Sequence, residues 1–283
     1  LLGVVTAGNF YKPADYAELS TVWCGFFQDD WKLTSKLTVT LGLRYELEGP
    51  LTERYNRSVR GFDFDAQLPF EAQAKANYAR NPIPEIPAAQ FSVRGGLTFA
   101  GVNGEPRTLW KRDTNNFMPR LGFAYSATPK TVLSGGYGTY FGPLGARRGD
   151  VIQAGFSRDT PVVASLDGGL TFKSTLANPF PDGILQPLGA AGGAMTDVGL
   201  GVTFFNPAPR AGRSDKWMFS IQRELPGRFM AEIRYMGSRG RDLEFDRPLT
   251  ALPTQYLSTQ PTRDQDRINY LSANLPNPLS GLL

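Results

Sequence analysis

Three groups of residues in this sequence have the types and spacing that catalysis or ligand binding could use. Asp29 and Asp30 are adjacent carboxylates, and paired carboxylates can share a proton or hold a metal ion. The glycine-rich run 135–138 (GGYG) is similar to loops that cradle phosphate groups. The basic and aromatic segment 107–117 (RTLWKRDTNNF) could contact an acidic ligand. Each signal also has a structural explanation, which depends on the element that carries it.

The structural explanation is the stronger one for each group. Asp29 and Asp30 end a segment that alternates like a strand, and adjacent strand residues point to opposite faces, so they cannot easily share a proton or a metal. The run 135–138 precedes no helix and lacks the helix N-terminus that binds phosphate, so we expect it to allow close packing or bending of a strand. We expect segment 107–117 to hold neighbouring loops together, with contact to an acidic ligand as the alternative.

The side chains that most often perform enzymatic chemistry are scarce. The sequence has no histidine, which removes the commonest general base and metal ligand. Its one cysteine, Cys24, excludes an internal disulfide and a cysteine-rich zinc site, and we expect it to be an inert apolar side chain in mid-strand. We therefore expect no enzyme and no cofactor. No catalytic, cofactor-binding or metal-binding residue is assigned, and the substrate-binding residues are left open.

Composition and charge narrow the class of protein further. The chain has 283 residues, of which 41% are hydrophobic and 20% charged, so it is too apolar for a disordered tail. The net charge of +4 is spread along the chain and does not indicate nucleic-acid binding. No apolar run reaches the roughly 18 residues of a membrane-spanning helix. The opening LLGVVTAGNF lacks the basic start and long apolar core of a secretion signal, so we interpret the chain as a fragment or processed product.

Strict alternation of apolar and polar residues marks the first expected hairpin. Residues 37–49 run LTVTLGLRYELEG, with apolar side chains at odd positions and polar residues or glycine between them. Such a strand separates an apolar medium from a polar one. It is longer than the usual strand of about 5 or 6 residues and matches the about 9 to 11 residues of a tilted membrane-spanning strand. The preceding segment 19–31 (LSTVWCGFFQDDW) is joined to it by a short polar connection and is expected to pair with it.

Two further hairpins with the same design are expected, and long segments separate the three. The strands are FMPRLGFAYSA and TVLSGGYGTYFG around a TPK turn, then KWMFSIQREL and FMAEIRYMGS around a PGR turn. Hairpins are expected at about 19–49, 117–142 and 216–243, with long loops at about 50–116, 143–215 and 244–283. Within the first long loop we expect a short helix near 70–80 and a turn at 102–105.

The regular difference between short and long connections predicts the fold class. Structureless loops of this length are unusual in compact soluble domains, where most connections have about 4 to 6 residues. Outer-membrane barrels combine short periplasmic turns with long extracellular loops. We therefore predict an all-β protein, an antiparallel transmembrane β-barrel segment of long hairpins, with all 283 residues belonging to one barrel domain.

The alternation also assigns side chains to the two faces of the expected barrel wall. Charged residues of the alternating strands should line a polar lumen, where we expect them to hydrate the wall or pair with a plug rather than contact substrate: Arg44, Glu46, Glu48, Glu232 and Arg234. Aromatic residues near the strand ends are expected at the membrane interfaces: Trp31, Tyr140, Phe141, Trp217 and Phe229.

Three segments resemble one family of membrane proteins. They are FFQDDWKLTSKLTVTLGLRYELEGPLTERYN (26–56), GVNGEPRTLWKRDTNNFMPRLGFAYSATPKTVLSGGYGTYFGP (101–143) and the strand pair ending RYMGSRGRDL (234–243), and they cover about half of the chain. They resemble TonB-dependent outer-membrane receptors, in particular the Oar-like group of Acidobacteria, whose members carry an N-terminal carboxypeptidase-regulatory-like domain. The resemblance implies a barrel of about 22 strands, a plug that closes it, and import energised by an inner-membrane TonB complex.

Only part of such a receptor is expected in this chain. No TonB box or plug pattern is visible, so the plug domain is expected to be absent, and the ending NLPNPLSGLL lacks an aromatic-terminated last strand. Six strands are too few for a closed barrel, because the smallest have about 8, so we expect a middle barrel segment with exposed edges. Ligand contacts in these receptors come from variable loops and plug apices, so no binding residue is carried over.

The resemblance also implies location and partners. The location is the outer membrane of a Gram-negative cell. The partners are outer-membrane lipid, the TonB complex through the missing plug region, and an extracellular solute such as a siderophore, oligosaccharide or peptide, with no nucleic acid. One alternative is a barrel for adhesion or surface display without import, which the absence of a plug and TonB box would favour. Another is a soluble all-β binding module, which detergent dependence and heat-modifiable migration would exclude.

Overall fold

The computed structural model describes residues 3–145 and 151–283 and divides into two compact units. The first unit comprises Leu1–Asp63 and Gly96–Leu243, and the second comprises Phe64–Gly95 and Glu244–Leu283. All six long strands belong to the first unit. Within the described residues, no helix has the length and apolar composition needed to cross a membrane.

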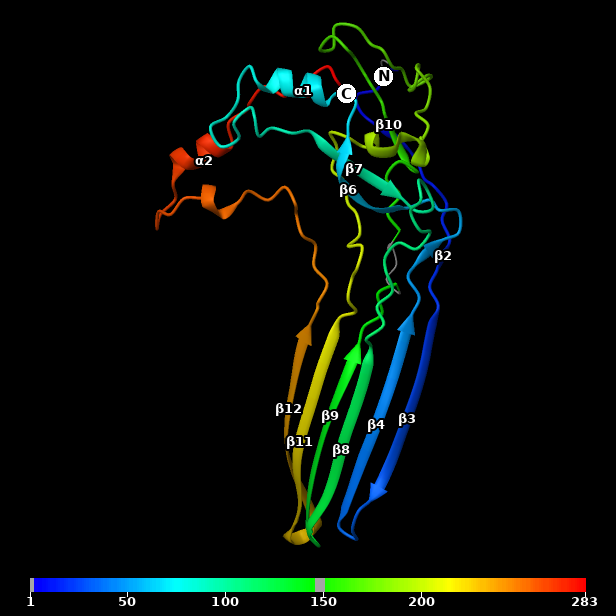
Figure 1. The fold of residues 1–283 in the computed structure, drawn as a ribbon, viewed down its shortest axis with the longest axis vertical. Coiled ribbons are helices and arrows are strands. Elements are labelled where there is room, and N and C mark those ends of the chain that lie inside the picture. The colour runs from blue at the N-terminus through cyan, green and yellow to red at the C-terminus, as the bar shows by residue number, and fades with distance from the viewer. Residues whose placement is uncertain (1–2, 146–150) are drawn as a thin grey trace. The chain divides into compact units, whose positions relative to one another are not determined.

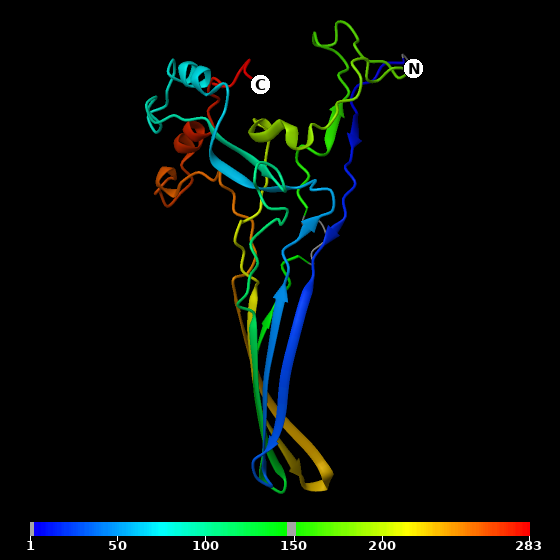
Figure 2. The ribbon, with the colours of Figure 1, turned by 45° about the vertical axis from the view of Figure 1, so that its right-hand side comes forward.

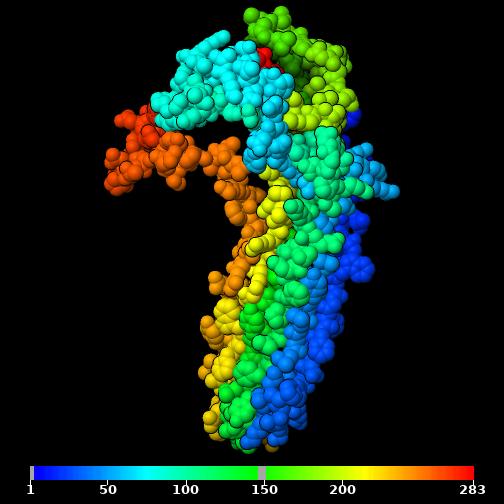
Figure 3. All heavy atoms as spheres, viewed as in Figure 1, coloured from blue at the N-terminus to red at the C-terminus, as the bar shows by residue number. Residues whose placement is uncertain are grey.

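Six long strands form one antiparallel sheet. In chain order they are β3 (Val22–Lys32), β4 (Leu37–Glu48), β8 (Phe117–Thr128), β9 (Thr131–Phe141), β11 (Arg213–Leu225) and β12 (Phe229–Arg241). They pair as β12-β11-β9-β8-β4-β3, so each strand lies beside its predecessor in this series (Figure 1). The ribbons stay side by side in the turned view, and in the space-filling view they form adjacent bands from blue to orange (Figures 2 and 3). The sheet is therefore an up-and-down meander with β3 and β12 at its edges.

Short turns join the strands of each hairpin, as the sequence predicts. Thr34 caps the first turn, where its hydroxyl oxygen accepts hydrogen bonds from the amides of Lys36 and Leu37 at 3.2 and 3.0 Å. A register shift between Ser126 and Thr128 lies directly beside the second turn, so the alternation along the rest of β8 is undisturbed. The three hairpins and the antiparallel all-β architecture agree with the fold class expected from the sequence.

The two faces of this sheet differ in chemistry because side chains alternate along each strand. One aligned row of directly paired residues crosses the whole sheet: Trp31, Val39, Phe123, Gly135, Phe219 and Tyr235. We call the face that carries this row the outer face and the opposite one the inner face. Large apolar side chains on the outer face are strongly exposed, with Phe27 at 72% and Ile233 at 77%. An apolar face of this extent requires a cover of hydrocarbon or protein.

Two glycines on the outer face make room for aromatic rings from neighbouring strands. A Cβ on Gly237 would lie 2.5 Å from Cε2 of Trp217, which is directly opposite on β11. A Cβ on Gly135 would lie 2.5 Å from Cε1 of Phe123 on β8. Both distances are far shorter than a van der Waals contact, so each ring lies flat over a glycine.

The long loops of the first unit contain their own packed structure, which sequence periodicity did not reveal. Leu51, Ala100, Leu109 and Trp110 form one buried cluster, and a second is formed by Val59, Leu97 and Phe99. The carboxylate of Glu53, which is fully buried, accepts hydrogen bonds from the amides of Ala17, Tyr55 and Arg57 at 3.0, 2.7 and 2.7 Å. The expected turn at 102–105 is present, with positive φ at Asn103 and Gly104.

Short elements complete the described structure. Two-stranded sheets are formed by β1 (Asn9–Lys12) with β10 (Arg158–Pro161), β2 (Glu18–Leu19) with β5 (Thr52–Glu53), and β6 (Val59–Gln67) with β7 (Arg94–Phe99). The helices are α1 (Glu71–Tyr78) and α2 (Gln265–Leu271), with 3-10 turns η1 (Gly189–Met195), η2 (Pro226–Arg228) and η3 (Thr254–Tyr256).

The second unit contains both helices. Helix α1 falls within the range expected from the sequence, and the carboxylate of Glu71 pairs with Nζ of Lys75 at 2.6 Å. The ring of Tyr78, at the end of α1, stacks on the loop aromatic Phe91, with centroids 3.9 Å apart. In α2, the hydroxyl of Tyr270 donates a hydrogen bond to Glu85 at 2.7 Å. This bond lowers the pKa of Glu85 and raises the pKa of Tyr270.

Candidate functional site

The charged residues expected in the lumen lie on the inner face, and most of their charge is neutralised locally. Nη2 of Arg44 lies 2.6 Å from Oε1 of Glu46, two residues along the same strand. Arg234 and Glu232 form the same kind of pair on β12, at 2.7 Å. Both contacts join neighbours of the same strand, a pairing within the wall itself that differs from the expected pairing with a plug.

Glu48, the last residue of β4, binds backbone amides instead of a neighbouring cation. Its Oε2 accepts a hydrogen bond from the amide of Leu144 and its Oε1 one from the amide of Gly145, both at 2.7 Å. These amides belong to the segment that follows β9, two strands away in the sheet. Glu48 therefore binds the start of the second long loop to the first hairpin.

A basic patch lies on the inner face between these neutralised pairs. It consists of Arg120 on β8, Tyr140 on β9 and Lys216 on β11, and we call it the inner-face basic patch. The guanidinium carbon of Arg120 lies 5.4 Å from the centroid of the Tyr140 ring, and Nζ of Lys216 lies 5.3 Å from it. Both distances are in the range of cation–π attraction. One aromatic ring thus holds two cations on a short stretch of wall.

Register and glycine spacing explain this arrangement. Gly138 is the direct pairing partner of both Arg120 and Lys216, so the two cations occupy one row with a glycine between them. A Cβ on Gly138 would lie only 3.0 Å from Oη of Tyr140. The absence of a side chain at 138 therefore allows the Tyr140 ring to lie over the strand between the two cations.

Neither cation of the patch is matched by an acidic side chain. Within the described part of the chain, Arg120 and Lys216 form no ion pair. Nε of Arg120 is buried and has no hydrogen-bond acceptor among the described residues. A buried donor without an acceptor costs about 1 to 3 kcal/mol. The patch is therefore a place where an anionic group would be stabilised.

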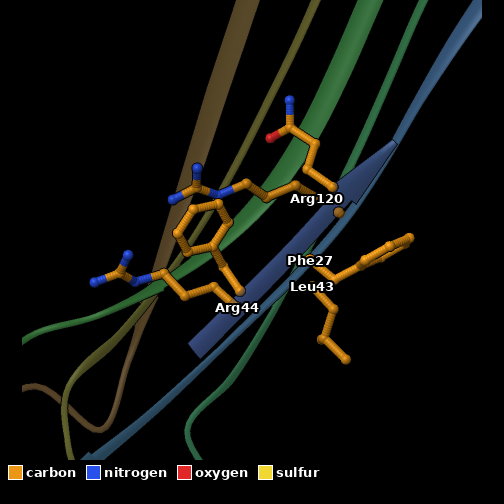
Figure 4. Close-up of a pocket in the computed structure, with 7 residues that line it drawn as sticks. Phe27, Leu43, Arg44 and Arg120 are labelled. Carbon is orange, nitrogen blue, oxygen red and sulfur yellow. The ribbon is translucent and has the colours of Figure 1, made fainter. Parts of the chain in front are cut away.

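Two hollows adjoin Arg120. The smaller, about 210 Å³, is lined by Phe26, Phe27, Gln28, Gly42, Leu43, Arg44 and Arg120. Figure 4 shows Arg44 and Arg120 projecting to one side of the sheet, while Phe27 and Leu43 project to the other. The larger, about 600 Å³, includes Arg120, Tyr140 and Lys216 in its lining. Arg120 is common to both hollows.

A second polar cluster lies on the outer face, near the loop end of the strands. Asp215 is 4% exposed, and its Oδ1 accepts hydrogen bonds from Oη of Tyr137 at 2.9 Å and from Oγ1 of Thr139 at 2.8 Å. Nε and Nη2 of Arg213 donate to the same oxygen at 3.0 and 2.8 Å. This cluster joins β9 to β11 through side chains, and its donors satisfy the buried carboxylate.

The residues first singled out as possible chemistry are separated by the structure. Register places Asp30 on the inner face, where it accepts a hydrogen bond from the Thr40 hydroxyl at 2.6 Å, while Asp29 falls on the outer face. The run 135–138 lies inside β9. Cys24 is in mid-strand, as expected, but it is exposed. Within the described residues, no group of three or more acidic or cysteine side chains could hold a metal ion.

The segment 107–117 makes the contacts expected of a segment that holds neighbouring loops together. Nε of Arg107 donates to Oδ1 of Asn56 at 2.8 Å, and its Nη2 donates to the carbonyl oxygens of Glu53 and Arg54 at 3.2 Å each. Trp110 is buried in the first loop cluster. The structure thus supports the structural interpretation of this segment.

One of the five expected interfacial aromatics is wrongly assigned. Register places Trp31, Phe141, Trp217 and Phe229 on the outer face, consistent with the expectation. Tyr140 is on the inner face, between Arg120 and Lys216, and cannot reach a lipid interface there. The signal was present in the sequence, because Tyr140 has the parity of Gly136 and Gly138 rather than that of the apolar residues of its strand.

The membrane class of the chain is settled by comparison with known families. A family model described as outer membrane beta barrel domain matches residues 1–278. The chain belongs to the outer membrane beta barrel domain family. No curated protein matches the sequence, and no solved structure matches it. This outer-membrane barrel chain is therefore located in the outer membrane, and the alternative of a soluble all-β module is wrong.

Membership of the family indicates which environment each face of the sheet contacts. The apolar outer face of this outer-membrane barrel chain meets hydrocarbon, and the inner face, with the inner-face basic patch, meets the lumen. In hydrocarbon, the backbone groups of a strand must be paired by neighbouring strands, which the antiparallel meander provides for β4, β8, β9 and β11.

Proposed function

We propose that this chain is the wall of a receptor that imports a bulky solute, such as a siderophore, oligosaccharide or peptide, with energy from a TonB complex. The observation that carries the proposal is the combination of a lumen-facing wall that has unmatched cations with long loops that fold into packed clusters. A wall that serves only as a structural cylinder has no need to leave Arg120 without an acceptor.

The packed loops support capture of a solute outside the cell. Two buried clusters, together with the buried carboxylate of Glu53, give the long loops of the first unit a defined shape. A surface with a defined shape can select a ligand, because less conformational entropy is lost on binding. Long loops with this organisation belong to the extracellular end of an outer-membrane barrel.

The requirement for a TonB complex rests on the resemblance of segments 26–56, 101–143 and 234–243 to TonB-dependent receptors. In this proposal, a plug outside these 283 residues provides the contact with the complex. Outer-membrane lipid and the solute are the other partners. The proposal includes no enzymatic step, no cofactor and no nucleic-acid partner.

The test is energy-dependent accumulation of labelled solutes. The protein is expressed from its complete reading frame in a Gram-negative host that lacks its own large-solute receptors. Accumulation of a labelled ferric siderophore, a maltooligosaccharide and an oligopeptide is measured with and without a protonophore, and in a strain that lacks the TonB complex. We expect saturable accumulation of one solute class, lost in both energy-depleted conditions.

Two results would contradict the proposal. Accumulation that is unchanged without the TonB complex would make the protein a passive pore. No accumulation of any of the three solutes, combined with attachment of expressing cells to a surface or to other cells, would favour the adhesion or surface-display alternative. Cells that carry the empty vector provide the baseline in each assay.

A further inference from the structure

We propose that the inner-face basic patch binds a carboxylate or phosphate group of a solute in the lumen. Arg120 and Lys216 supply the positive charge, and Tyr140 holds both of them in place. The biological role of this site, as a station for an imported anionic solute, rests on the proposed uptake function. The binding step itself rests only on the geometry of the patch.

Arg120 and Lys216 differ from the two paired arginines of the inner face. Arg44 and Arg234 lie on the same inner face, but each is already bridged to a glutamate at 2.6 and 2.7 Å. Arg120 and Lys216 have no such partner within the described chain, and Nε of Arg120 is buried without an acceptor. A guanidinium is never deprotonated in a protein, so its charge must be met by water or by an anion.

The two cations approach one ring from strands on either side of β9. They occupy a single row, two strands apart, which places their backbones about 10 Å from each other. Their long side chains both reach the Tyr140 ring, with Cζ of Arg120 and Nζ of Lys216 at 5.4 and 5.3 Å from its centroid, so both cations adjoin the same ring. Arginine offers a planar fork that matches a carboxylate or phosphate, and lysine adds a mobile point charge.

Glycines leave the patch open from the lumen. Gly42 and Gly138 are the residues directly opposite Arg120 on its two neighbouring strands, so no Cβ stands beside it in its row, and the Tyr140 ring occupies the space over Gly138. Arg120 lines both adjoining hollows, of about 210 and 600 Å³, which give a solute room beside it. The site is thus both charged and accessible.

The test is titration calorimetry on the detergent-purified protein, expressed from its complete reading frame. Citrate and pyrophosphate serve as the carboxylate and phosphate probes, first at low ionic strength and then with added NaCl. We expect one or both to bind, with affinity that falls as salt is added. Arg120→Met and Lys216→Met should each weaken binding about tenfold or more, which is the scale of one charge-assisted contact.

Matched variants separate loss of the site from loss of the fold. Arg234→Met removes an inner-face cation that is already paired, and we expect binding to stay within about twofold of the wild type. Lys216→Arg keeps the charge and should keep most of the affinity. Folding of every variant is checked by the different gel mobility of heated and unheated samples.

The outcomes of these measurements decide the proposal. Binding of citrate alone assigns the site to carboxylates, and binding of pyrophosphate alone assigns it to phosphates. If neither probe binds, or if Arg234→Met weakens binding as much as Arg120→Met, the proposal is overturned. If neither probe binds and Arg120→Met lowers the melting temperature, a carboxylate of the protein itself occupies the patch, which also overturns it.

The uptake proposal fails independently of this one. Probe binding that depends on Arg120, without energy-dependent accumulation of any solute, would leave the anion site standing and remove the uptake function. If a solute accumulates with energy dependence, Arg120→Met and Lys216→Met do not change that accumulation, and no probe binds, the uptake function stands and the anion site is removed.

Discussion

Replacement of Asp215 by alanine should strongly destabilise the barrel wall. The carboxylate is 4% exposed and accepts hydrogen bonds from Tyr137, Thr139 and Arg213. Alanine leaves the hydroxyls of Thr139, which is buried, and Tyr137 with only each other, 3.2 Å apart, in place of this shared acceptor, and a buried group left unsatisfied costs about 1 to 3 kcal/mol. The guanidinium of Arg213, which is one-third exposed, can turn to water and adds less.

The expected loss in the free energy of unfolding is about 2 to 4 kcal/mol. Asp215→Asn keeps an oxygen at the same place and should lose less, about 1 to 2 kcal/mol, because only the charge and part of the hydrogen bonding are removed. The ordering of the two variants is a sharper expectation than either value, since it depends only on which atoms remain.

The assay is urea-induced unfolding of the protein in lipid vesicles, followed by tryptophan fluorescence and by the mobility of unheated samples in gels. Asp29→Ala is the matched control, because Asp29 is also an aspartate on the outer face but is exposed, and its carboxylate makes no hydrogen bond or ion pair within the described chain. We expect that control to stay within about 0.5 kcal/mol of the wild type. Equal stability of Asp215→Ala and Asp29→Ala would refute the reasoning.

Two further predictions test packing and titration. Gly237→Ala should displace the Trp217 ring, shift its fluorescence and lower the free energy of unfolding by about 1 to 3 kcal/mol. Gly25→Ala is the control and should be nearly neutral, because a Cβ there has nothing within 4 Å. Equal effects of the two variants would exclude ring contact as the cause. Hydrogen bonds, chiefly from Thr171, lower the pKa of Asp167 to about 2 from its usual 3.8. The turn formed by residues 165–171 should therefore be fully stabilised above about pH 4 and should loosen as the pH falls through 2. Carboxyl NMR titration gives this pKa directly, and a value near 3.8 would show that these bonds are absent in solution.

The sequence predicts the sheet well because a barrel wall separates an apolar medium from a polar one. Side chains along each strand therefore alternate between apolar and polar. The alternation between Leu37 and Leu47 follows from one face in lipid and one in the lumen, so periodicity alone was enough to place the strand. Turn residues such as Thr34 and the PGR sequence then set the hairpins.

The packed loops could not be predicted in the same way. Leu51 and Leu109 meet across more than fifty residues, and no local period connects them. Their contact depends on how the chain returns to the rim, which is a tertiary property. The absence of periodicity therefore predicts only a loop in a segment that holds buried clusters.

The inner-face basic patch was missed for a related reason. Arg120 and Lys216 stand on strands separated by more than ninety residues of chain, and only the pairing of both with Gly138 brings them together. Tyr140 was assigned to the interface by its residue type, although its parity placed it on the polar face. Strand parity was the better guide, and cross-strand register was the information that was missing.

The contact of Glu48 with the amides of Leu144 and Gly145 has a mechanical consequence. This carboxylate ties the segment after β9 to β4, across the intervening β8. A displacement of the second long loop must therefore either break two charge-assisted hydrogen bonds or move β4 with it. A force on that loop is therefore transmitted to two hairpins. Glu48 connects the loop mechanically to β4, the strand that carries Arg44.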